Sequence, residues 1–424
     1  MSPRELLLDS FKAAVAAADP LAIVPQHLPK PPKGRTLVVG AGKAAASMAL
    51  AVEQHWPAAA PLDGTVITRY AHGLLTNRIT VVEAGHPVPD EAGAAAAQRI
   101  LDSAKRLSRD DLLLALVSGG GSSLLSLPVE TIAMTDLKDV TKELLRCGAT
   151  IQEINTVRKH LSAIQGGRLA AVCKAKILAL VISDVTGDDP THVASGPCAP
   201  DPTTYQDALG ILERYGCKIP KAVQETLARG MHGELAETPK PGDKVFAKTE
   251  NRVIATAHQS LHAAAKYFEA NGVRAAILGD SVTGEAREVA KVYAALAREV
   301  KARSEPWQPP VALISGGECT VTVRGNGRGG RCAEFLLSLV NELKGMEGIH
   351  ALACDTDGID GTEDNAGAVA TPDSFAHATK LGLRADQLLA SNDSYGYFAA
   401  LGDLVVTGPT RTNVNDYRVI LVTA

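Results

Sequence analysis

The sequence predicts a two-domain α/β protein, and two features of its pattern support that prediction. Short apolar runs alternate with helical patterns, and the runs at 112–117 and 177–182 are apolar without alternation. Strands of that kind are buried on both faces, as in a parallel sheet covered by helices. Aromatic residues make up only 4% of the 424 residues, so the core has to be built from small aliphatic side chains, which suits helices layered on sheets.

The first half of the chain has the element order of a doubly wound, Rossmann-like parallel sheet. Strands are predicted at 36–39, 64–68, 79–82, 112–117 and 177–182, and a helix at 90–107. The N-terminal segment has apolar residues near helical spacing and acidic residues among them, which predicts a packed amphipathic helix and not a secretory signal. Residues 1–235 are therefore predicted to form the N-terminal domain.

A second α/β domain is predicted over residues 236–424. The stretch 231–250 loses its periodicity and contains Pro239, Pro241 and Gly242, which favours a crossing between domains. Beyond this stretch, strands are predicted at 253–255, 274–278, 311–314, 351–353, 404–406 and 419–422, and helices at 258–270 and 285–302.

Charge and cysteine usage exclude several classes of protein. Forty-three Lys and Arg against 47 Asp and Glu give a formal net charge of −4, which lacks the basic surplus of a general nucleic-acid binder. No run of about 18 apolar residues is present, so no membrane span is expected. The seven cysteines are scattered without a CxxC pair, which disfavours a disulfide framework or a zinc cage and favours a cytoplasmic location.

The turn after the first predicted strand combines glycines with a lysine. Gly40, Gly42 and Lys43 lead into an Ala-rich helix, and such a turn lets the backbone approach a phosphate at the helix N-terminus. The spacing fits the dinucleotide fingerprint GxGxxA, but the second strand ends near Arg69 and not at an acidic residue, which disfavours NAD and leaves NADP open. A plain strand–helix turn with a solvated lysine explains this motif equally well when it is taken alone.

Further glycine-rich turns follow other strands, and their N–H and hydroxyl groups can bind an anion. The first of these turns consists of Gly119, Gly120, Gly121, Ser122 and Ser123. Gly316, Gly317 and Glu318 form the second, and the segment 324–331 alternates Arg with Gly before a helix. Several such turns in one chain favour a polyanionic ligand over bare turns.

Aspartates stand near the ends of strands, where open α/β sheets bind ligands. Asp184, Asp188 and Asp357 can hold Mg²⁺ if water and phosphate complete its shell, although Asp-Gly turns are also ordinary loop chemistry. His86 lies in a Pro-rich loop, where a cleft-lining and a structural role are equally open. The helical pair His258 and His262 lacks the glutamate and the third ligand of a zinc site.

With these motifs assembled, the chain resembles the class II glycerate 2-kinases, which carry a MOFRL domain at the C-terminus. Many members of that family bear hydroxypyruvate reductase as a provisional name. The resemblance extends from Val38 to about Val422 and rests on several motifs in one order. They are GAGKA at 40–44, GHPVPD at 85–90, VSGGGSS at 117–123, SDVTGD at 183–188, ASGP at 194–197, SGGE at 315–318, DTDGIDG at 355–361 and TGPTRTNVND at 407–416.

The resemblance implies ATP-dependent phosphorylation of D-glycerate at its 2-hydroxyl, with ATP and Mg²⁺ as cofactors. It implies a site in the cleft between two α/β domains, the second with a mixed sheet and a MOFRL region at about 310–420. The family's lysine and arginine correspond to Lys43 and Arg331, and Glu334 is also retained. Cys332 and Ala333 replace an Asn-Gln pair found in many members, so contacts of those amides are not carried over.

Motifs and resemblance together predict a role for each candidate residue. Lys43 and Arg331 are expected to neutralise the transferred group from the two domains, and their removal is expected to reduce turnover far more than stability. Asp184 or Asp188 is expected to bind Mg²⁺ or to accept the proton of the hydroxyl, and which aspartate has which role is left open. Asp357 is a second candidate for binding the metal. The nucleotide or its phosphates are assigned to Gly40, Gly42, Gly119, Gly120, Gly121, Ser122, Ser123, Gly316, Gly317 and Glu318. The hydroxy acid is assigned to His86, Arg331 and Glu334.

Two alternatives stay open beside the kinase. An NADPH-dependent hydroxypyruvate reductase fits the first glycine turn and Arg69 but makes little use of the other glycine turns and the aspartates. A nucleotide-binding regulator without turnover is the third class. Small-molecule substrates are the only partners expected, and whether the chain forms a homodimer is left open.

Overall fold

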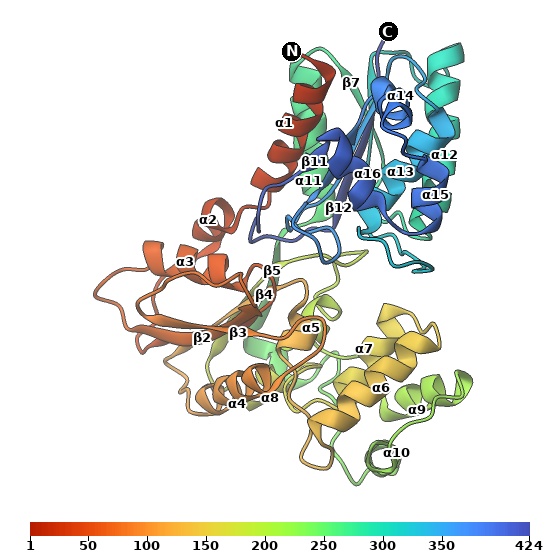
Figure 1. Ribbon diagram of the computed structural model, residues 1–424. Helices are drawn as coiled ribbons and strands as arrows, with labels where there is room; N and C mark the ends of the chain where they lie inside the picture. The colour runs from red at the N-terminus through yellow and green to blue at the C-terminus, as the bar shows by residue number, and fades with distance from the viewer. The chain divides into compact units, whose positions relative to one another are not determined.

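The computed structural model describes all 424 residues and contains two compact units (Figure 1). Residues 20–254 form the first, here called the parallel-sheet unit, and residues 1–19 with 255–424 form the second, here called the mixed-sheet unit. Each unit is built around its own six-stranded sheet. The predicted fold class, a doubly wound parallel sheet followed by an α/β domain with a mixed sheet, is confirmed.

The parallel-sheet unit has the strand order β3-β2-β1-β4-β5-β6, which is the order of dinucleotide-binding sheets. Its strands are β1 (Thr36–Ala41), β2 (Leu62–Arg69), β3 (Ile79–Ala84), β4 (Leu112–Ser118), β5 (Lys176–Ile182) and β6 (Thr249–Ala255). Because β1 pairs in parallel with both β2 and β4, the strand order reverses between β1 and β4. The turns that follow these two strands therefore lie side by side, at the point where open α/β sheets bind ligands.

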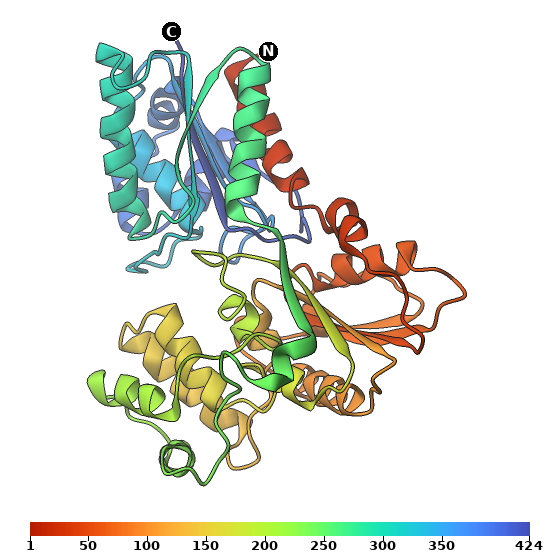
Figure 2. The ribbon, with the colours of Figure 1, turned by 180° about the vertical axis from the view of Figure 1, so that it is seen from behind.

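Helices cover both faces of this sheet (Figures 1 and 2). One face is covered by α3 (Ala45–His55), with α2 (Pro20–Ile23) and η1 (Val24–His27) beside it. On the other face lie α4 (Glu91–Lys105), α5 (Gly121–Leu124) and α8 (Arg168–Val172). Asp90 caps α4 by accepting the N–H of Gly93, and the helix then buries a stripe of small apolar side chains against the sheet.

A cluster of helices with its own apolar core extends the parallel-sheet unit and was not predicted. Its members are α6 (Met134–Arg146), α7 (Ile151–His160), α9 (Tyr205–Arg214) and α10 (Lys221–Met231). Leu137, Val157 and Leu227 are among the residues that these helices bury against one another. The short helices η2 (Val193–Ser195) and η3 (Lys244–Lys248) complete the unit.

The mixed-sheet unit has the strand order β11-β10-β9-β12-β8-β7. Its strands are β7 (Arg274–Gly279), β8 (Val311–Gly317), β9 (Ile349–Asp355), β10 (Gly367–Ala370), β11 (Leu404–Val405) and β12 (Asp416–Val422). Only β7 and β8 pair in parallel, and β12 is antiparallel to both β8 and β9. The ends of β8 and β9 and the start of β12 therefore lie at one edge of the sheet.

Helices also cover both faces of the mixed sheet (Figure 1). One face packs against α1 (Pro3–Ala16) and α11 (Ala257–Ala270). The other packs against α12 (Ala286–Arg303) and α13 (Arg331–Leu343), with α14 (Pro372–Lys380), α15 (Ala385–Ala390) and α16 (Ser394–Leu401) around α13. None of the helices in the structure combines the length and the apolar character needed to cross a membrane.

The division into units differs from the predicted division between residues 235 and 236. The stretch 231–250 returns to the parallel sheet, because β6 forms an edge of that sheet and the N–H of Asp201 donates to the carbonyl of Pro239 at 2.8 Å. The N-terminal helix belongs to the mixed-sheet unit, where the hydroxyl of Tyr417 donates to Oγ of Ser10 at 2.9 Å. A loss of periodicity marks a loop, but it does not reveal to which sheet the chain returns.

Candidate active site

The turn after β1 is closed by hydrogen bonds to its neighbours in the sheet. The N–H of Lys43 donates to the carbonyl of Gly119 at 2.8 Å, and the N–H of Ala44 donates to Oγ of Ser118 at 3.1 Å. The N–H of Gly42 donates to the carbonyl of Ile67 at 3.1 Å. These three N–H groups, which a dinucleotide-binding turn would offer to a pyrophosphate, are therefore already used inside the protein.

The turn after β4 has backbone N–H groups that are not used in hydrogen bonds within the protein. Gly120 precedes α5 with φ of +77°, a conformation that glycine adopts at little cost, and α5 begins at Gly121. The N–H groups of Gly120, Gly121 and Ser122 have no hydrogen-bond acceptor within the chain. Of the two predicted anion-binding turns in this unit, the turn after β4 is the one with donors available to a ligand.

His86 and Lys43 converge on Gly120. A Cβ built on this glycine would lie 2.9 Å from Nε2 of His86 and 3.3 Å from Cγ of Lys43. Burial, followed by the positive charge of Lys43 and other nearby cations, lowers the pKa of His86 to about 3. The imidazole is therefore neutral near pH 7, so it can donate or accept a hydrogen bond but does not contribute positive charge.

A chain of hydrogen bonds links the turn after β4 to α7. The hydroxyls of Ser122 and Ser195 lie 2.9 Å apart, and Ser195 donates to Oδ1 of Asn155 at 3.1 Å. Nη1 of Arg158 donates to the same oxygen at 3.0 Å. Because Ser195 gives its one proton to Asn155, Ser122 donates to Ser195 and is not a free donor for an anion. Ser123 likewise donates to the carbonyl of Gly120, at 3.2 Å.

Asp184 and Asp188 follow β5, next to β4 in the sheet, and both are partly buried. The turn between them places Asp188 at φ of +54°. The chain has no group of three or more His, Cys, Asp or Glu side chains placed to hold a metal ion. A Mg²⁺ bound by these aspartates would therefore have at most two carboxylates as protein ligands of this kind, with phosphate and water supplying the others.

In the mixed-sheet unit, Arg331 binds carboxylates from three strand ends. Nε lies 2.8 Å from Oδ1 of Asp416, Nη2 lies 2.7 Å from Oδ2 of Asp355, and Nη1 lies 2.9 Å from Oε1 of Glu318. Burial opposes the charge of the guanidinium, but these carboxylates outweigh burial and raise the pKa of Arg331 well above its ordinary value. Arg331 is thus held in place and its charge is already compensated.

The other predicted residues at this edge also have partners of their own. Asp357 accepts the N–H of Ile359 at 2.8 Å and is buried. Glu334 is buried and lies 2.6 Å from Nη2 of Arg287, and it accepts a hydrogen bond from Asn392 at 2.9 Å. The assignments of Asp357 to a metal and of Glu334 to a substrate stay predictions, and these buried contacts weigh against the second.

Close packing accounts for glycines that the sequence assigned to phosphate binding in this unit. Gly317, at φ of +105°, lies so close to Val282 that a Cβ would collide with the backbone N of that residue. Gly327 packs in the same way against Asp393, whose Cβ would lie 2.5 Å from an added Cβ. These glycines would be required whether or not an anion binds there.

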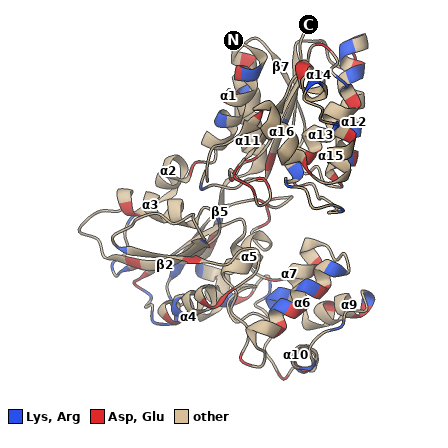
Figure 3. Cartoon of the chain, viewed as in Figure 1, with Lys and Arg blue, Asp and Glu red and all other residues tan.

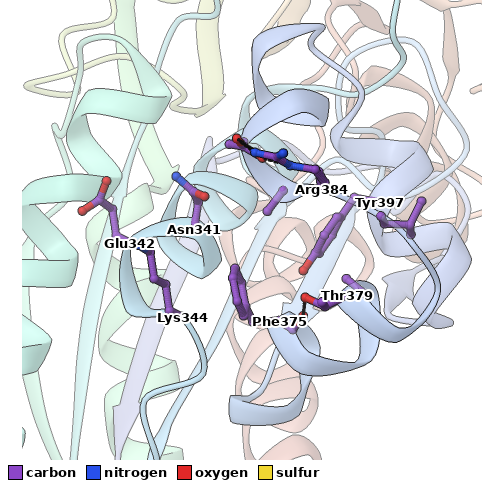
Figure 4. Close-up of a pocket in the computed structure, with 11 residues that line it drawn as sticks. Asn341, Glu342, Lys344, Phe375, Thr379, Arg384 and Tyr397 are labelled. Carbon is purple, nitrogen blue, oxygen red and sulfur yellow. Dashed lines mark hydrogen bonds and ion pairs between the residues drawn. The ribbon is translucent and has the colours of Figure 1, made fainter.

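A cavity of about 710 Å³ in the mixed-sheet unit is lined by α13 to α16 and not by the strand ends (Figure 4). Among its polar side chains, Arg384 pairs with Asp386 at 2.6 Å and the hydroxyl of Tyr397 donates to the carbonyl of Ser374 at 3.1 Å. None of the candidate residues lines this cavity. The candidate residues lie instead at the strand ends, where the N–H groups of the turn after β4 are unused.

Sequence reasoning gave no role to Asn155, Arg158 or Ser195, although Ser195 lies in the ASGP motif at 194–197. The helix that carries the first two was not predicted, and the network forms only when α7 packs beside the turn after β4. One signal was present, since Arg158, Lys159 and His160 are three consecutive basic residues in an otherwise mixed segment.

A Rossmann-type sheet with a glycine turn at its strand reversal defines a doubly wound α/β protein, a class whose ligands bind at that reversal. Residues 6–228 match the family model described as "Domain of unknown function (DUF4147)", and residues 311–416 match the MOFRL family. The chain belongs to the glycerate kinase family, which combines these two regions, and the resemblance drawn from the motifs is confirmed.

Named relatives span the whole chain. A protein of Agrobacterium vitis named "Putative hydroxypyruvate reductase" is 49% identical over 425 residues, covering 100% of this chain and 95% of that protein. A glycerate 2-kinase of Pyrococcus horikoshii is 38% identical, covering 100% and 98%. The crystal structure of a glycerate kinase from Thermotoga maritima is similar with a TM-score of 0.87 and 38% identity, covering 99% of each chain.

Proposed function

We propose that the protein is a kinase that transfers the γ-phosphoryl group of ATP to the 2-hydroxyl of D-glycerate, giving 2-phosphoglycerate and ADP. The observation that carries the proposal is the turn after β4, whose unused N–H groups lie beside Lys43 at the reversal of strand order. Phosphoryl transfer depends mostly on positioning and on electrostatic stabilisation by cations and N–H donors. The names of the Pyrococcus and Thermotoga relatives support the same activity.

In this proposal the parallel-sheet unit supplies the groups that meet the phosphate. The N–H groups of Gly120, Gly121 and Ser122 hold phosphate oxygens, and Lys43 neutralises the charge that develops on the transferred group. His86, as a neutral imidazole, positions an oxygen by a hydrogen bond. Mg²⁺, when bound with the nucleotide, neutralises phosphate charge.

The carboxylates after β5 have the remaining roles. Asp184 or Asp188 accepts the proton of the attacking 2-hydroxyl or binds Mg²⁺, and both roles suit a partly exposed carboxylate at a strand end. Arg331 remains a candidate for a role in catalysis because its guanidinium is partly exposed. Its three ion pairs, however, give it first a structural role, which is to hold the carboxylates of Glu318, Asp355 and Asp416 in position. Glu318, the most exposed of its partners, is the one a ligand would displace most easily.

A reductase that transfers hydride from NADPH to hydroxypyruvate is the second candidate. The name of the Agrobacterium relative and the strand order favour it, and Arg69 ends β2 where a 2′-phosphate would bind. Against it stands the turn after β1, because the N–H groups of Gly42, Lys43 and Ala44 are consumed by protein acceptors.

Two assays on the purified protein decide between these functions. The first supplies ATP, Mg²⁺ and D-glycerate and measures ADP together with 2-phosphoglycerate, and the second supplies NADPH and hydroxypyruvate and follows NADPH absorbance. We expect ADP and 2-phosphoglycerate in the first and no oxidation in the second. The opposite pair of results would establish the reductase, and thermal stabilisation by ATP without product in either assay would indicate a regulator.

A further inference from the structure

Three consecutive basic residues end α7, and two of them face carboxylates. Nζ of Lys159 lies 3.4 Å from Oδ1 of Asp201, and Nε2 of His160 lies 3.4 Å from Oε2 of Glu237. Lys159 and Asp201 are both almost completely buried, with 1% and 0% of their side chains exposed. Each of these two basic side chains thus has a carboxylate beside it within the parallel-sheet unit.

Arg158 is the exception among the three. Its hydrogen-bond partner is the amide oxygen of Asn155, at 3.0 Å, and no carboxylate of the parallel-sheet unit lies within ion-pair distance of its guanidinium. Removal from water without a counter-ion lowers the pKa of Arg158 to about 10, which still leaves the group charged at neutral pH. A partly buried cation paired only with a neutral amide is costly unless an anion joins it.

The position of Arg158 relative to the turn after β4 is fixed by hydrogen bonds. Asn155 accepts from Arg158 and from Ser195, and Ser195 lies 2.9 Å from the hydroxyl of Ser122. The positive charge of Arg158 is one of the nearby charges that lower the pKa of His86, and the His86 ring lies against Gly120. Lys and Arg are frequent along α6 and α7 (Figure 3), yet Arg158 is the one that this network connects to the unused N–H donors.

We infer that Arg158 binds the carboxylate of the three-carbon acid substrate and selects the acid over neutral analogues that lack the carboxylate. The inference rests on the proposed function for its substrate class, but it holds equally for glycerate and hydroxypyruvate, because both carry one carboxylate. A guanidinium matches a carboxylate with two parallel N–H···O bonds, and Arg158 has donors left after Asn155 takes one. The N–H groups of Gly120 to Ser122 are then left for phosphate.

The test measures affinity and turnover separately in four proteins: the wild type, Arg158→Gln, Arg158→Lys and Arg146→Gln. Arg146 is the matched control, because it lies on the adjacent α6 and pairs only at the surface, with Glu143. Calorimetric titration with D-glycerate gives the Kd without any need for catalysis. Kinase assays with D-glycerate and with glyceramide, its neutral amide, give KM and kcat where turnover occurs.

We expect Arg158→Gln to weaken D-glycerate binding about 10- to 100-fold, the effect of losing a charge-assisted hydrogen bond. The KM for ATP should stay within about twofold of the wild-type value, and the preference for glycerate over glyceramide should shrink by the same factor as the binding. Arg158→Lys should fall between the wild type and Arg158→Gln, because it keeps the charge and loses the planar pair of donors. It also serves as the decisive variant if Arg158→Gln does not fold.

Several outcomes would overturn the inference. They are unchanged glycerate affinity in the folded Arg158 variants, an equal loss in Arg146→Gln, or a rise confined to the KM for ATP, which would place a phosphate at Arg158. Failure of the proposed function is a separate result, because a wild type that forms no ADP still gives a Kd for glycerate or hydroxypyruvate. In that case, weaker binding of the acid by the Arg158 variants but not by Arg146→Gln would still support a carboxylate site at Arg158. Only the kinase activity would then be rejected.

Discussion

Nη2 of Arg331 lies 2.7 Å from Oδ2 of Asp355, the last residue of β9. The same guanidinium reaches Asp416 at the start of β12 and Glu318 just after β8, so one side chain ties three strand ends to the first turn of α13. The side chains of Asp355 and Asp416 are 3% and 0% exposed, and Asp416 also pairs with Arg418 at 3.2 Å, so Arg331 is one of the cations that compensate these buried charges. The expectation that removing Arg331 would spare stability therefore has to be replaced.

Arg331→Ala is expected to lower the free energy of unfolding by about 3 kcal/mol, because it removes a cation shared by two buried carboxylates, of which Asp416 keeps its pair with Arg418. Urea denaturation followed by circular dichroism measures the change. Arg328→Ala is the matched control, since Arg328 is 60% exposed and its pair with Glu363 at 3.4 Å should contribute no more than about 0.5 kcal/mol. Equal stabilities for the two variants would show that the ion pairs of Arg331 do not hold the edge of the sheet.

The strands of the parallel sheet were predictable because they are local features of the sequence. The apolar runs that became β4 and β5 have no polar face, and glycine-rich or acidic turns follow them directly. Those runs and turns were enough to predict the parallel sheet and to place Gly119 to Ser123 at a strand end. The same locality let the resemblance to a kinase family be drawn from short motifs.

The features that were not predictable depend on contacts between distant parts of the chain. Phe11 stacks on Tyr417 with ring centroids 6.0 Å apart, and no local pattern near residue 11 indicates a partner 406 positions away. The sequence around Arg331 does not indicate that the side chain is paired, because its carboxylate partners are residues 318, 355 and 416, which lie elsewhere in the chain. Arg158 was missed because its importance lies in the absence of an acid, which only the packing of α7 reveals.

Gly120→Ala is expected to reduce turnover at least about tenfold, because a Cβ there would press on Nε2 of His86 and on the stem of Lys43. It should also cost about 1 kcal/mol of stability for placing alanine at a positive φ. Thermal denaturation and the kinase assay measure the two effects separately.

Gly148→Ala provides a control with the same backbone conformation. Gly148 also has φ of +77°, but nothing lies within 4 Å of an added Cβ. This variant should show a similar loss of stability and full activity. If both variants lost activity alike, the contact between Gly120 and His86 would have no part in the site.

His86 should make the parallel-sheet unit less stable in acid. Its pKa is about 3 in the folded protein, against an ordinary value of about 6.5 for the unfolded chain. Below about pH 6.5 the unfolded chain binds a proton that the folded chain does not, so stability falls with pH by about 1.4 kcal/mol per unit until about pH 3. At neutral pH and above, this contribution is fully present.

His86→Gln removes this titration while keeping a neutral hydrogen-bonding side chain. Urea denaturation of both proteins at about pH 7.5 and about pH 5 should show that the wild type loses about 2 kcal/mol more than the variant between the two values. A parallel decline in both proteins would mean that His86 is not held neutral by its surroundings.

Lys43→Met is expected to lower kcat about 10²- to 10³-fold, the usual effect of removing one group that stabilises charge in the transition state. Methionine keeps most of the apolar stem that lies beside Gly120, so the melting temperature should change little. Since Lys43 is assigned to the transferred phosphoryl group, the KM for D-glycerate should move far less than kcat, whereas Arg158→Gln should show the reverse. Lys105→Met, which removes an exposed lysine on α4, controls for the loss of a positive charge as such. A kcat within twofold of the wild-type value in a folded Lys43→Met protein would remove Lys43 from the mechanism and leave the N–H groups after β4 as the phosphate site.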